Sequence, residues 1–236
     1  MRTVLVSGAR RGIGAAIAAR LLGEGHNVSI GLRGGEHPDW AGDASLRPYV
    51  ERLHLVDYDA LDRNAATRWV GEARERFGSI DTIVANAGIM IARSVIEAND
   101  DDVQAMFDVN VQAPRRLAKA AWDQLAECGQ GRVIILSSLS GKRVKSAKAG
   151  SYALTKFAAT ALAHAIRHAG FDLGIRATAV CPGFVATDMA LGVSDRPPEL
   201  MTDPRDLARI VSLLISLPNE ASVAEFAVNC QIEESF

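Results

Sequence analysis

Short runs of β-branched and other apolar residues alternate along the chain with longer segments in which apolar residues recur at helical spacing. The runs VLV at 4–6 and RVIIL at 132–136 are hydrophobic almost throughout, which is typical of strands buried on both faces of a parallel sheet. The alternation therefore predicts an α/β fold, a doubly wound parallel sheet of about seven strands with helices on both faces. We expect strands over 3–7, 28–32, 52–56, 82–85, 132–137, 175–181 and 225–230, and helices over 13–22, 64–77, 101–109, 111–128, 151–168 and 204–217.

Length and composition are those of one large domain. The chain has 236 residues, of which 48% are hydrophobic, and no repeat, low-complexity tract or linker composition divides it, so we expect a single domain over 1–236. Its 26 basic and 28 acidic residues leave a formal net charge of -2. This balance argues against nucleic acid or an anionic membrane as a partner.

The cysteines and the apolar runs bear on localisation. Cys128, Cys181 and Cys230 are widely spaced and include no C-x-x-C pair, which argues against a disulfide framework or a structural zinc site. No apolar run approaches the roughly 18 residues needed to cross a bilayer. Arg10 and Arg11 have the look of a twin-arginine export signal, but charged residues at helical spacing interrupt the apolar segment that follows. We expect a cytoplasmic protein.

One irregular stretch, 184–202, lies late in the expected sheet and combines apolar residues with glycine and prolines. It is either a mobile lid over a ligand or an exposed connection. Its position and apolar content favour the lid.

The stretch SGARRGIG at 7–14 separates the first expected strand from the first expected helix, with Gly8, Gly12 and Gly14 spaced as G-x-x-x-G-x-G. Glycines at such a crossover allow a tight turn and let a pyrophosphate approach the amide groups at the helix N-terminus, where the dipole favours negative charge. The stretch therefore indicates a dinucleotide site.

Further short motifs follow in order along the chain. They are ANAG at 85–88, DVNV at 108–111, LSSLSG at 136–141, SYALTK at 151–156 and CPGFVAT at 181–187. Together with the glycine spacing they resemble the short-chain dehydrogenase/reductase family over essentially the whole chain. The resemblance implies a Rossmann-type domain acting on a small carbonyl or secondary alcohol. It also implies homodimer or homotetramer assembly through the helices after Val109 and Ser151.

The resemblance also assigns catalytic roles. Ser138 holds the substrate oxygen, Tyr152 passes a proton, Lys156 binds the nicotinamide ribose, and Asn110 holds a water that relays protons. Tyr152 and Lys156 are an i, i+4 pair and share one face of a helix. A tyrosine of pKa near ~10 needs a stabilised phenolate to transfer protons at neutral pH, and we expect the Lys156 ammonium to lower its pKa.

The choice of cofactor depends on the end of the second expected strand. Leu32 stands where an NAD-specific site usually carries Asp or Glu. Arg33 follows directly and Arg11 lies in the glycine turn, so two guanidinium groups either clamp a 2′-phosphate or are solvated surface charges. We predict NADP(H) as the preferred cofactor and NAD(H) as the weaker one. By resemblance the cofactor is also bound by Ser7, Gly8, Arg10, Gly12, Ile13, Gly14, Asp57, Asn86, Ala87, Gly88, Tyr152, Lys156, Pro182, Gly183, Val185 and Thr187.

Two other groups of polar residues invite a functional interpretation. His164 and His168 have the i, i+4 spacing of zinc ligands but lack a neighbouring glutamate or third ligand, so we expect no metal and place them in the last helical turns. The segment at 141–150 either attracts an anionic substrate or is a solvated basic loop, and the second is favoured. Its basic residues are Lys142, Arg143, Lys145 and Lys148.

Two rival functions use the same sheet: a catalytically silent dinucleotide-binding sensor or scaffold, and a methyltransferase. The joint presence of Asn110, Ser138, Tyr152 and Lys156 favours the oxidoreductase, because a pure binder has no need of a pair that stabilises a phenolate. The C-terminal segment EFAVNCQIEESF lacks the V-D-G-G-like ending of many family members, which leaves the assembly open.

Overall fold

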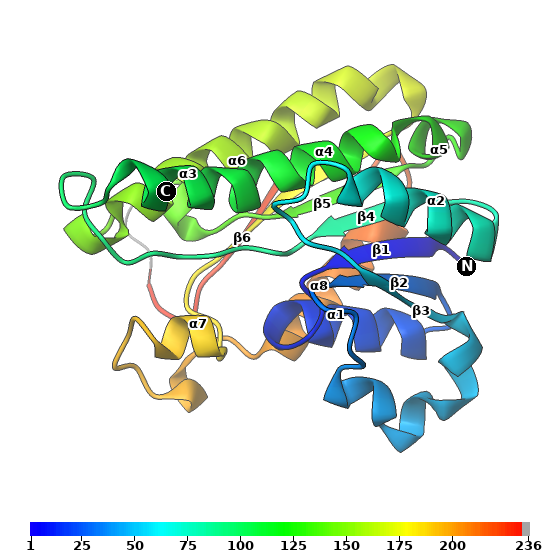
Figure 1. Ribbon diagram of the computed structural model, residues 1–236, viewed down its shortest axis with the longest axis horizontal. Helices are drawn as coiled ribbons and strands as arrows, with labels where there is room; N and C mark the ends of the chain where they lie inside the picture. The colour runs from blue at the N-terminus through cyan, green and yellow to red at the C-terminus, as the bar shows by residue number, and fades with distance from the viewer. Residues whose placement is uncertain (233–236) are drawn as a thin grey trace.

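The parallel sheet expected from the alternating pattern is present in the computed structural model, which describes residues 1–232 (Figure 1). These residues form a seven-stranded, all-parallel sheet in the order β3-β2-β1-β4-β5-β6-β7. Residues 233–236 of the atypical tail lie outside the described range. The strands are β1 (Thr3–Ser7), β2 (Asn27–Leu32), β3 (Leu53–Asp57), β4 (Thr82–Ala85), β5 (Arg132–Leu136), β6 (Arg176–Pro182) and β7 (Glu225–Val228).

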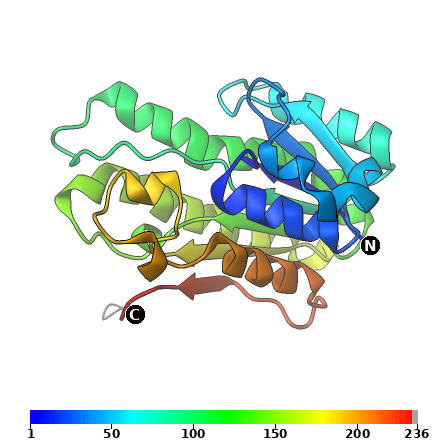
Figure 2. The same ribbon diagram turned by 90° about the horizontal axis from the view of Figure 1, so that it is seen from below.

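Helices cover both faces of the sheet. In Figures 1 and 2 helices α1 and α8 lie side by side on one face, and α2, α4, α5 and α6 cover the other. Successive residues of β1 serve the two faces in turn: Leu5 packs into the core under α2 and α6, whereas Val4 and Val6 pack under α1 and α8. The doubly wound prediction is confirmed. The helices are α1 (Gly12–Gly23), α2 (Ala65–Phe77), α3 (Asp100–Phe107), α4 (Ala113–Ala120), α5 (Trp122–Glu127), α6 (Gly150–Gly170), α7 (Asp188–Leu191) and α8 (Pro204–Ser216).

Local signals explain where several helices begin. The Asn99 side chain accepts a hydrogen bond from the backbone N–H of Asp102 at 2.7 Å and caps α3, whose first turn carries three aspartates. Asp203 caps α8 in the same way, accepting from the N–H of Arg205 at 2.8 Å. Proline in the first turn suits both α4 and α8, because the first amides of a helix have no partner within it.

The segment expected as a helix over 111–128 is divided in the structure. A π-helical turn at Asp108–Gln112 precedes α4, and Ala121, with φ -95 and ψ 7, separates α4 from α5. Two short 3-10 segments, Asp39–Gly42 and Ala44–Arg52, were not expected from the periodicity. The last strand also ends earlier than expected, at Val228.

The carboxyl ends of the strands point toward the side of the molecule that carries α7 (Figure 1). The order of the strands reverses between β1 and β4, and the carboxyl edge at such a reversal is where open α/β sheets bind ligands. The stretch 184–202 is closed at its base by pairing of Val185 with Thr202, where the N–H of Ala186 donates to the Thr202 carbonyl at 3.0 Å. In the described part of the chain, no helix has the length and apolar character to span a membrane.

Candidate active site

The turn after β1 is hydrogen-bonded to the turn after β4. Ser7 Oγ accepts hydrogen bonds from the backbone N–H groups of Asn86 and Ala87, both at 3.1 Å. The Asn86 amide group in turn donates to the carbonyls of Ser7 and Gly8, at 3.1 and 3.0 Å. A Cβ atom on Gly14 would lie only 2.4 Å from both Asn86 Nδ2 and the Gly8 oxygen, so this glycine is required by packing alone.

The glycine turn has the geometry of an anion cradle. Gly8 and Gly12 have φ values of 68 and 61, which favour glycine, and no side chain caps the start of α1. The first turn of α1 carries no acidic residue, so its amides and dipole suit a pyrophosphate group. These residues therefore fit the dinucleotide that the sequence indicates. Trp40 lies against the same turn, where its Nε1 donates to the Ala9 carbonyl at 2.7 Å.

Tyr152 and Lys156 lie in the first turns of α6, as their spacing predicts, and both are buried, with 7% and 5% of their surfaces exposed. Lys156 Nζ lies 5.6 Å from the centroid of the Tyr152 ring and donates to the carbonyl of Leu136, at the end of β5, at 2.8 Å. The pair is therefore anchored to the strand that precedes Ser138.

Ser138 begins the short 3-10 turn after β5. Its Oγ accepts from the backbone N–H of Ser140 at 3.0 Å, and its side chain lies close enough to Tyr152 to act on the pKa of the phenol. The end of this turn packs against α6, since a Cβ on Gly141 would lie 2.5 Å from the Lys156 carbonyl oxygen. Ser138, Tyr152 and Lys156 thus come together at the carboxyl edge of the sheet.

Asn110 lies in the π-helical turn before α4, at 2% exposure. Its Oδ1 accepts from the N–H of Ile89, and its Nδ2 donates to the Ile89 carbonyl and to Thr155 Oγ1, all at 2.9 Å. A Cβ on Gly88 would lie 3.2 Å from Asn110 Oδ1 and 3.6 Å from Lys156 Nζ, so both side chains face this glycine. Thr155 is absent from the predicted site. Only its position in SYALTK, one residue before the lysine, would have drawn attention to it.

Burial dominates the electrostatics of the pair. Desolvation raises the pKa of Tyr152, and the hydrogen bond from Ser138 opposes this rise. Desolvation lowers the pKa of Lys156 to about 8, with a small opposing effect from Cys181. Lys156 is not among the causes of the Tyr152 shift, and its amine donates to a backbone carbonyl. The expected lowering of the tyrosine pKa by Lys156 is therefore not found in this arrangement.

The arginines of the glycine turn point in different directions. Arg10 Nη2 donates to the carbonyl of Arg33 at 3.1 Å, and its Nη1 pairs with Glu36 at 3.0 Å. Arg11 instead forms an ion pair of 2.9 Å with Asp188, the first residue of α7. The structure brings Arg10, and not Arg11, to the end of β2.

Other predicted cofactor residues line the same edge. Asp57, at the end of β3, accepts from the backbone N–H of Gly34 at 2.8 Å, beside Arg33. Pro182 ends β6 and Gly183 follows it, and the Pro182 carbonyl lies 3.5 Å from Ser138 Oγ. Val185 and Ile13 pack with the core under α1, and a Cβ on Gly12 would lie 3.1 Å from Thr187 Cγ2.

His168 lies in the last turn of α6, as expected, and Lys145 and Lys148 are exposed, whereas His164 and Lys142 have a carboxylate partner. His164 Nε2 lies 2.6 Å from Glu225 Oε1, and Lys142 forms an ion pair with the same carboxylate, so neither side chain is merely solvated. Among the described residues no group of His, Cys, Asp and Glu is arranged to hold a metal ion.

A cavity of about 270 Å³ lies near the start of β6, at the opposite edge of the sheet, and its arginines, Arg167 and Arg176, hydrogen-bond to Ser222 Oγ and to backbone carbonyls respectively.

Comparison with known proteins agrees with this geometry. The profile of the family described as "short chain dehydrogenase" matches residues 2–197. The chain belongs to the short-chain dehydrogenase/reductase family. This is a family of NAD(P)-dependent oxidoreductases with a Rossmann-type fold, as the motifs predict.

Similar curated proteins include an agropine synthesis reductase of Rhizobium rhizogenes, 36% identical over 98% of this chain and 53% of the relative. The chain thus spans about half the length of the agropine synthesis reductases that it matches. A cyclic-di-GMP-binding biofilm dispersal mediator protein of Escherichia coli is 34% identical over 79% of this chain and 74% of the relative.

Two solved structures illustrate the shared fold. An alcohol dehydrogenase of Thermococcus sibiricus, complexed with 5-hydroxy-NADP, has a TM-score of 0.85 at 26% identity and covers 99% of both chains. A short-chain dehydrogenase of Burkholderia cenocepacia in complex with NADP has a TM-score of 0.87 at 28% identity, covering 97% of this chain and 96% of its own.

Proposed function

We propose that this chain is an NADP(H)-preferring oxidoreductase that interconverts a carbonyl compound and the corresponding secondary alcohol. The observation that carries the proposal is the meeting of Ser138, Tyr152 and Lys156 at the edge of the sheet where the uncapped α1 helix begins. Both the buried amine and the buried phenol are unusual at such an edge unless they serve chemistry.

Each of the four candidate catalytic residues has a defined role in the proposed reaction. Ser138 orients the substrate oxygen by a hydrogen bond, and Tyr152 donates a proton to that oxygen or removes one from it. Lys156 binds the nicotinamide ribose, while Asn110, held by Ile89 and Thr155, orients a water. The nicotinamide, when bound, supplies or accepts the hydride.

The preference for NADP(H) rests on the end of β2. Leu32 leaves this strand without the carboxylate that would repel a 2′-phosphate, and Arg33 follows it with an exposed side chain. Arg10 reaches the same turn, where Glu36 neutralises part of its charge. The NADP and 5-hydroxy-NADP complexes of the two similar structures support this preference.

We also propose that the stretch 184–202 is a lid over the substrate. Its base is fixed by the Val185–Thr202 pairing, while Met189, Leu191 and Leu200 expose 43%, 47% and 56% of their surfaces. Exposed apolar side chains beside a catalytic edge suit contact with an organic substrate.

The chain is proposed to form a homodimer or homotetramer through α4 and α6. Helix α6 presents the exposed apolar residues Leu154 and Phe157, together with Ala161 and Ala165, along one outer face.

The test of the proposed reaction is the fall of NADPH absorbance with a panel of ketones, aldehydes and quinones. Tyr152→Phe should lower kcat by about 10²- to 10⁴-fold, because it removes the proton donor, and should leave the calorimetric Kd for NADPH within about twofold. Tyr49→Phe, in the 3-10 segment Ala44–Arg52, is the matched control and should retain activity.

Turnover retained by Tyr152→Phe would contradict the proton-transfer role. Tight NADPH binding by the wild-type chain without turnover of any compound would instead favour a cofactor-binding sensor.

A further inference from the structure

Three segments of the chain meet at the side chain of Glu225, the first residue of the edge strand β7. One carboxylate oxygen, Oε2, forms an ion pair with Lys142 Nζ, and the other, Oε1, lies 2.6 Å from His164 Nε2. The Lys142 and Glu225 side chains are only 26% and 27% exposed, so the contact is largely shielded from water. Shielding makes such a charge-assisted contact stronger than an exposed surface pair.

The two partners of Glu225 belong to the two segments that carry the catalytic side chains. Lys142 directly follows the turn that begins at Ser138, and His164 lies two helical turns beyond Lys156 on α6. Glu225 therefore joins the serine segment to the tyrosine–lysine helix through a third element, β7.

The same two segments are also joined from inside. Ser137 Oγ donates to the Lys156 carbonyl at 3.0 Å and lies 2.7 Å from Thr160 Oγ1. These buried hydroxyl contacts lie close to the catalytic residues, whereas the Glu225 contact lies farther along α6. Two separated points of attachment restrict rotation of the serine segment about α6, which one point cannot do.

Charge also supports the contact. Hydrogen bonds from Lys142 and then His164 hold the pKa of the Glu225 carboxyl below its ordinary value, against the effect of burial, so the carboxylate is ionised at neutral pH. Lys142 is thereby engaged within the protein, and its ammonium group is directed toward β7.

We propose that Glu225 is a positioning residue for the reaction: through Lys142 and His164 it fixes the Ser138 segment relative to the helix that carries Tyr152 and Lys156. This inference rests on the proposed function for its effect on turnover. The holding of the segment by Glu225 is a property of the fold and can be measured without turnover.

The experiment compares Glu225→Ala with Glu220→Gln, a change at an exposed glutamate in the loop before β7. Hydrogen exchange at the amides of Gly141 and Lys142, which donate to the carbonyls of Ser138 and Leu139, should become at least about fivefold faster in Glu225→Ala. The amides of β1 should exchange as in the wild type, which separates a local release from general destabilisation.

Turnover gives the second readout. In Glu225→Ala kcat should fall about tenfold while the calorimetric Kd for NADPH stays within about twofold, and Glu220→Gln should match the wild type. Glu225→Gln, whose side chain can still bond to Lys142 and His164, should retain more of the kcat than Glu225→Ala does, because it keeps hydrogen bonds to both segments.

Unchanged exchange at Gly141 and Lys142 in Glu225→Ala would overturn the proposal, as would faster exchange throughout the sheet or an equal loss of kcat in Glu225→Gln and Glu225→Ala. If the wild-type chain turns over no carbonyl compound, the proposed function fails, and the exchange measurement alone decides whether Glu225 holds the segment.

Discussion

The amine of Lys156 is buried and donates to a backbone carbonyl rather than to a carboxylate. Because burial lowers its pKa to about 8, the folded chain releases this proton at a lower pH than the unfolded chain does. Between these two pKa values the unfolded state binds more protons, so the free energy of unfolding should rise as pH increases.

We therefore expect the wild-type chain to gain about 2 kcal/mol of stability between pH 7 and pH 10, relative to Lys156→Met. Urea unfolding of both proteins at intervals across this range measures the difference. The range stops at pH 10 because the raised pKa of Tyr152 acts in the opposite direction above it. A difference that stays constant with pH would show that the amine is not buried in its charged form.

Arg33 permits a test of cofactor choice. Its side chain is exposed and has no carboxylate partner among the described residues, which leaves the guanidinium free to meet a 2′-phosphate. Arg33→Ala should lower kcat/KM for NADPH about tenfold and leave kcat/KM for NADH nearly unchanged. Arg47→Ala, an exposed arginine elsewhere, is the control, and an equal loss with both cofactors would contradict the 2′-phosphate contact.

Spacing along the chain was enough to predict which residues gather at the site, since an i, i+4 pair shares a helix face and motifs after parallel strands share one edge. It could not predict that Lys156 donates to Leu136, because that contact depends on how α6 lies across β5. The sequence predicted Arg11 beside Arg33, whereas the structure has Arg10 there. The direction of each arginine side chain depends on the path of the turn after Gly8, which spacing along the chain does not show.

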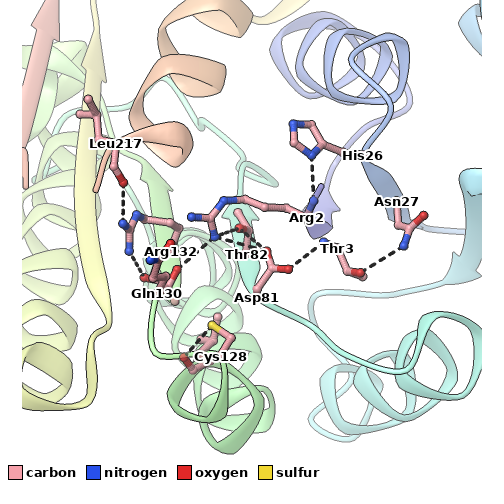
Figure 3. Close-up of polar contacts among 12 residues, drawn as sticks. Arg2, Thr3, His26, Asn27, Asp81, Thr82, Cys128, Gln130, Arg132 and Leu217 are labelled. Atoms are coloured by element: carbon pink, nitrogen blue, oxygen red, sulfur yellow. Dashed lines mark hydrogen bonds and ion pairs between the residues drawn. The ribbon is translucent and has the colours of Figure 1, made fainter. Parts of the chain in front are cut away.

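At the scale of the elements, arginine side chains form hydrogen bonds at the amino ends of the strands. Arg132, the first residue of β5, is 3% exposed and donates to the Leu217 carbonyl after α8 at 2.6 Å (Figure 3). It also donates to Asn219 Oδ1 at 2.9 Å. Arg2 donates to the Gln130 carbonyl at 3.0 Å and pairs with Asp81, which also accepts from the backbone N–H of Thr3. These contacts satisfy carbonyls that strand and helix ends leave without partners.

Loss of the Arg132 guanidinium should be costly, because buried carbonyls would lose their donors. Arg132→Met is expected to lower the free energy of unfolding by about 2 kcal/mol, measured by urea unfolding at pH 7. Arg74→Met, at an exposed site on α2, should change it by no more than about 0.5 kcal/mol. Equal effects of the two changes would mean that the contacts of Arg132 contribute little.

The alternation of strands and helices is strong enough to be read from hydrophobic pattern, because each element has its own period. The π-helical turn at Asp108–Gln112 cannot be predicted from this pattern, because its Asn110 bonds to Ile89, which is distant in the sequence. The two 3-10 segments before β3 cannot be predicted in this way either, because they are too short to show a clear period of hydrophobic residues.

For the whole molecule, the apolar face of α6 determines the expected assembly. Phe157→Glu should place a charge in the proposed interface and shift the protein toward the monomer in sedimentation velocity. Leu213→Glu is the matched control, since Leu213 is 56% exposed on α8, away from this face, and should leave the assembly unchanged. Sedimentation of the wild-type chain as a monomer would contradict the proposed interface.

The single sheet with two covered faces follows from the sequence pattern, whereas the contact partners of the C-terminal strand do not. The ending of this chain differs from the usual family pattern, and Glu225 at the start of β7 is joined to Lys142 and His164 by tertiary folding alone. No local signal in EFAVNCQIEESF indicates these partners.

The hydrogen bond from the Trp40 indole to the Ala9 carbonyl makes the fluorescence of Trp40 a probe of the turn after β1. Indole emission responds to changes in polarity and hydrogen bonding, so a dinucleotide that settles on the turn after β1 should alter the fluorescence of Trp40. Trp69, with 0% exposure and its Nε1 bonded to Ser29, should emit unchanged and serve as an internal reference. Binding to this chain can therefore be followed by light, without a label and before any substrate is known.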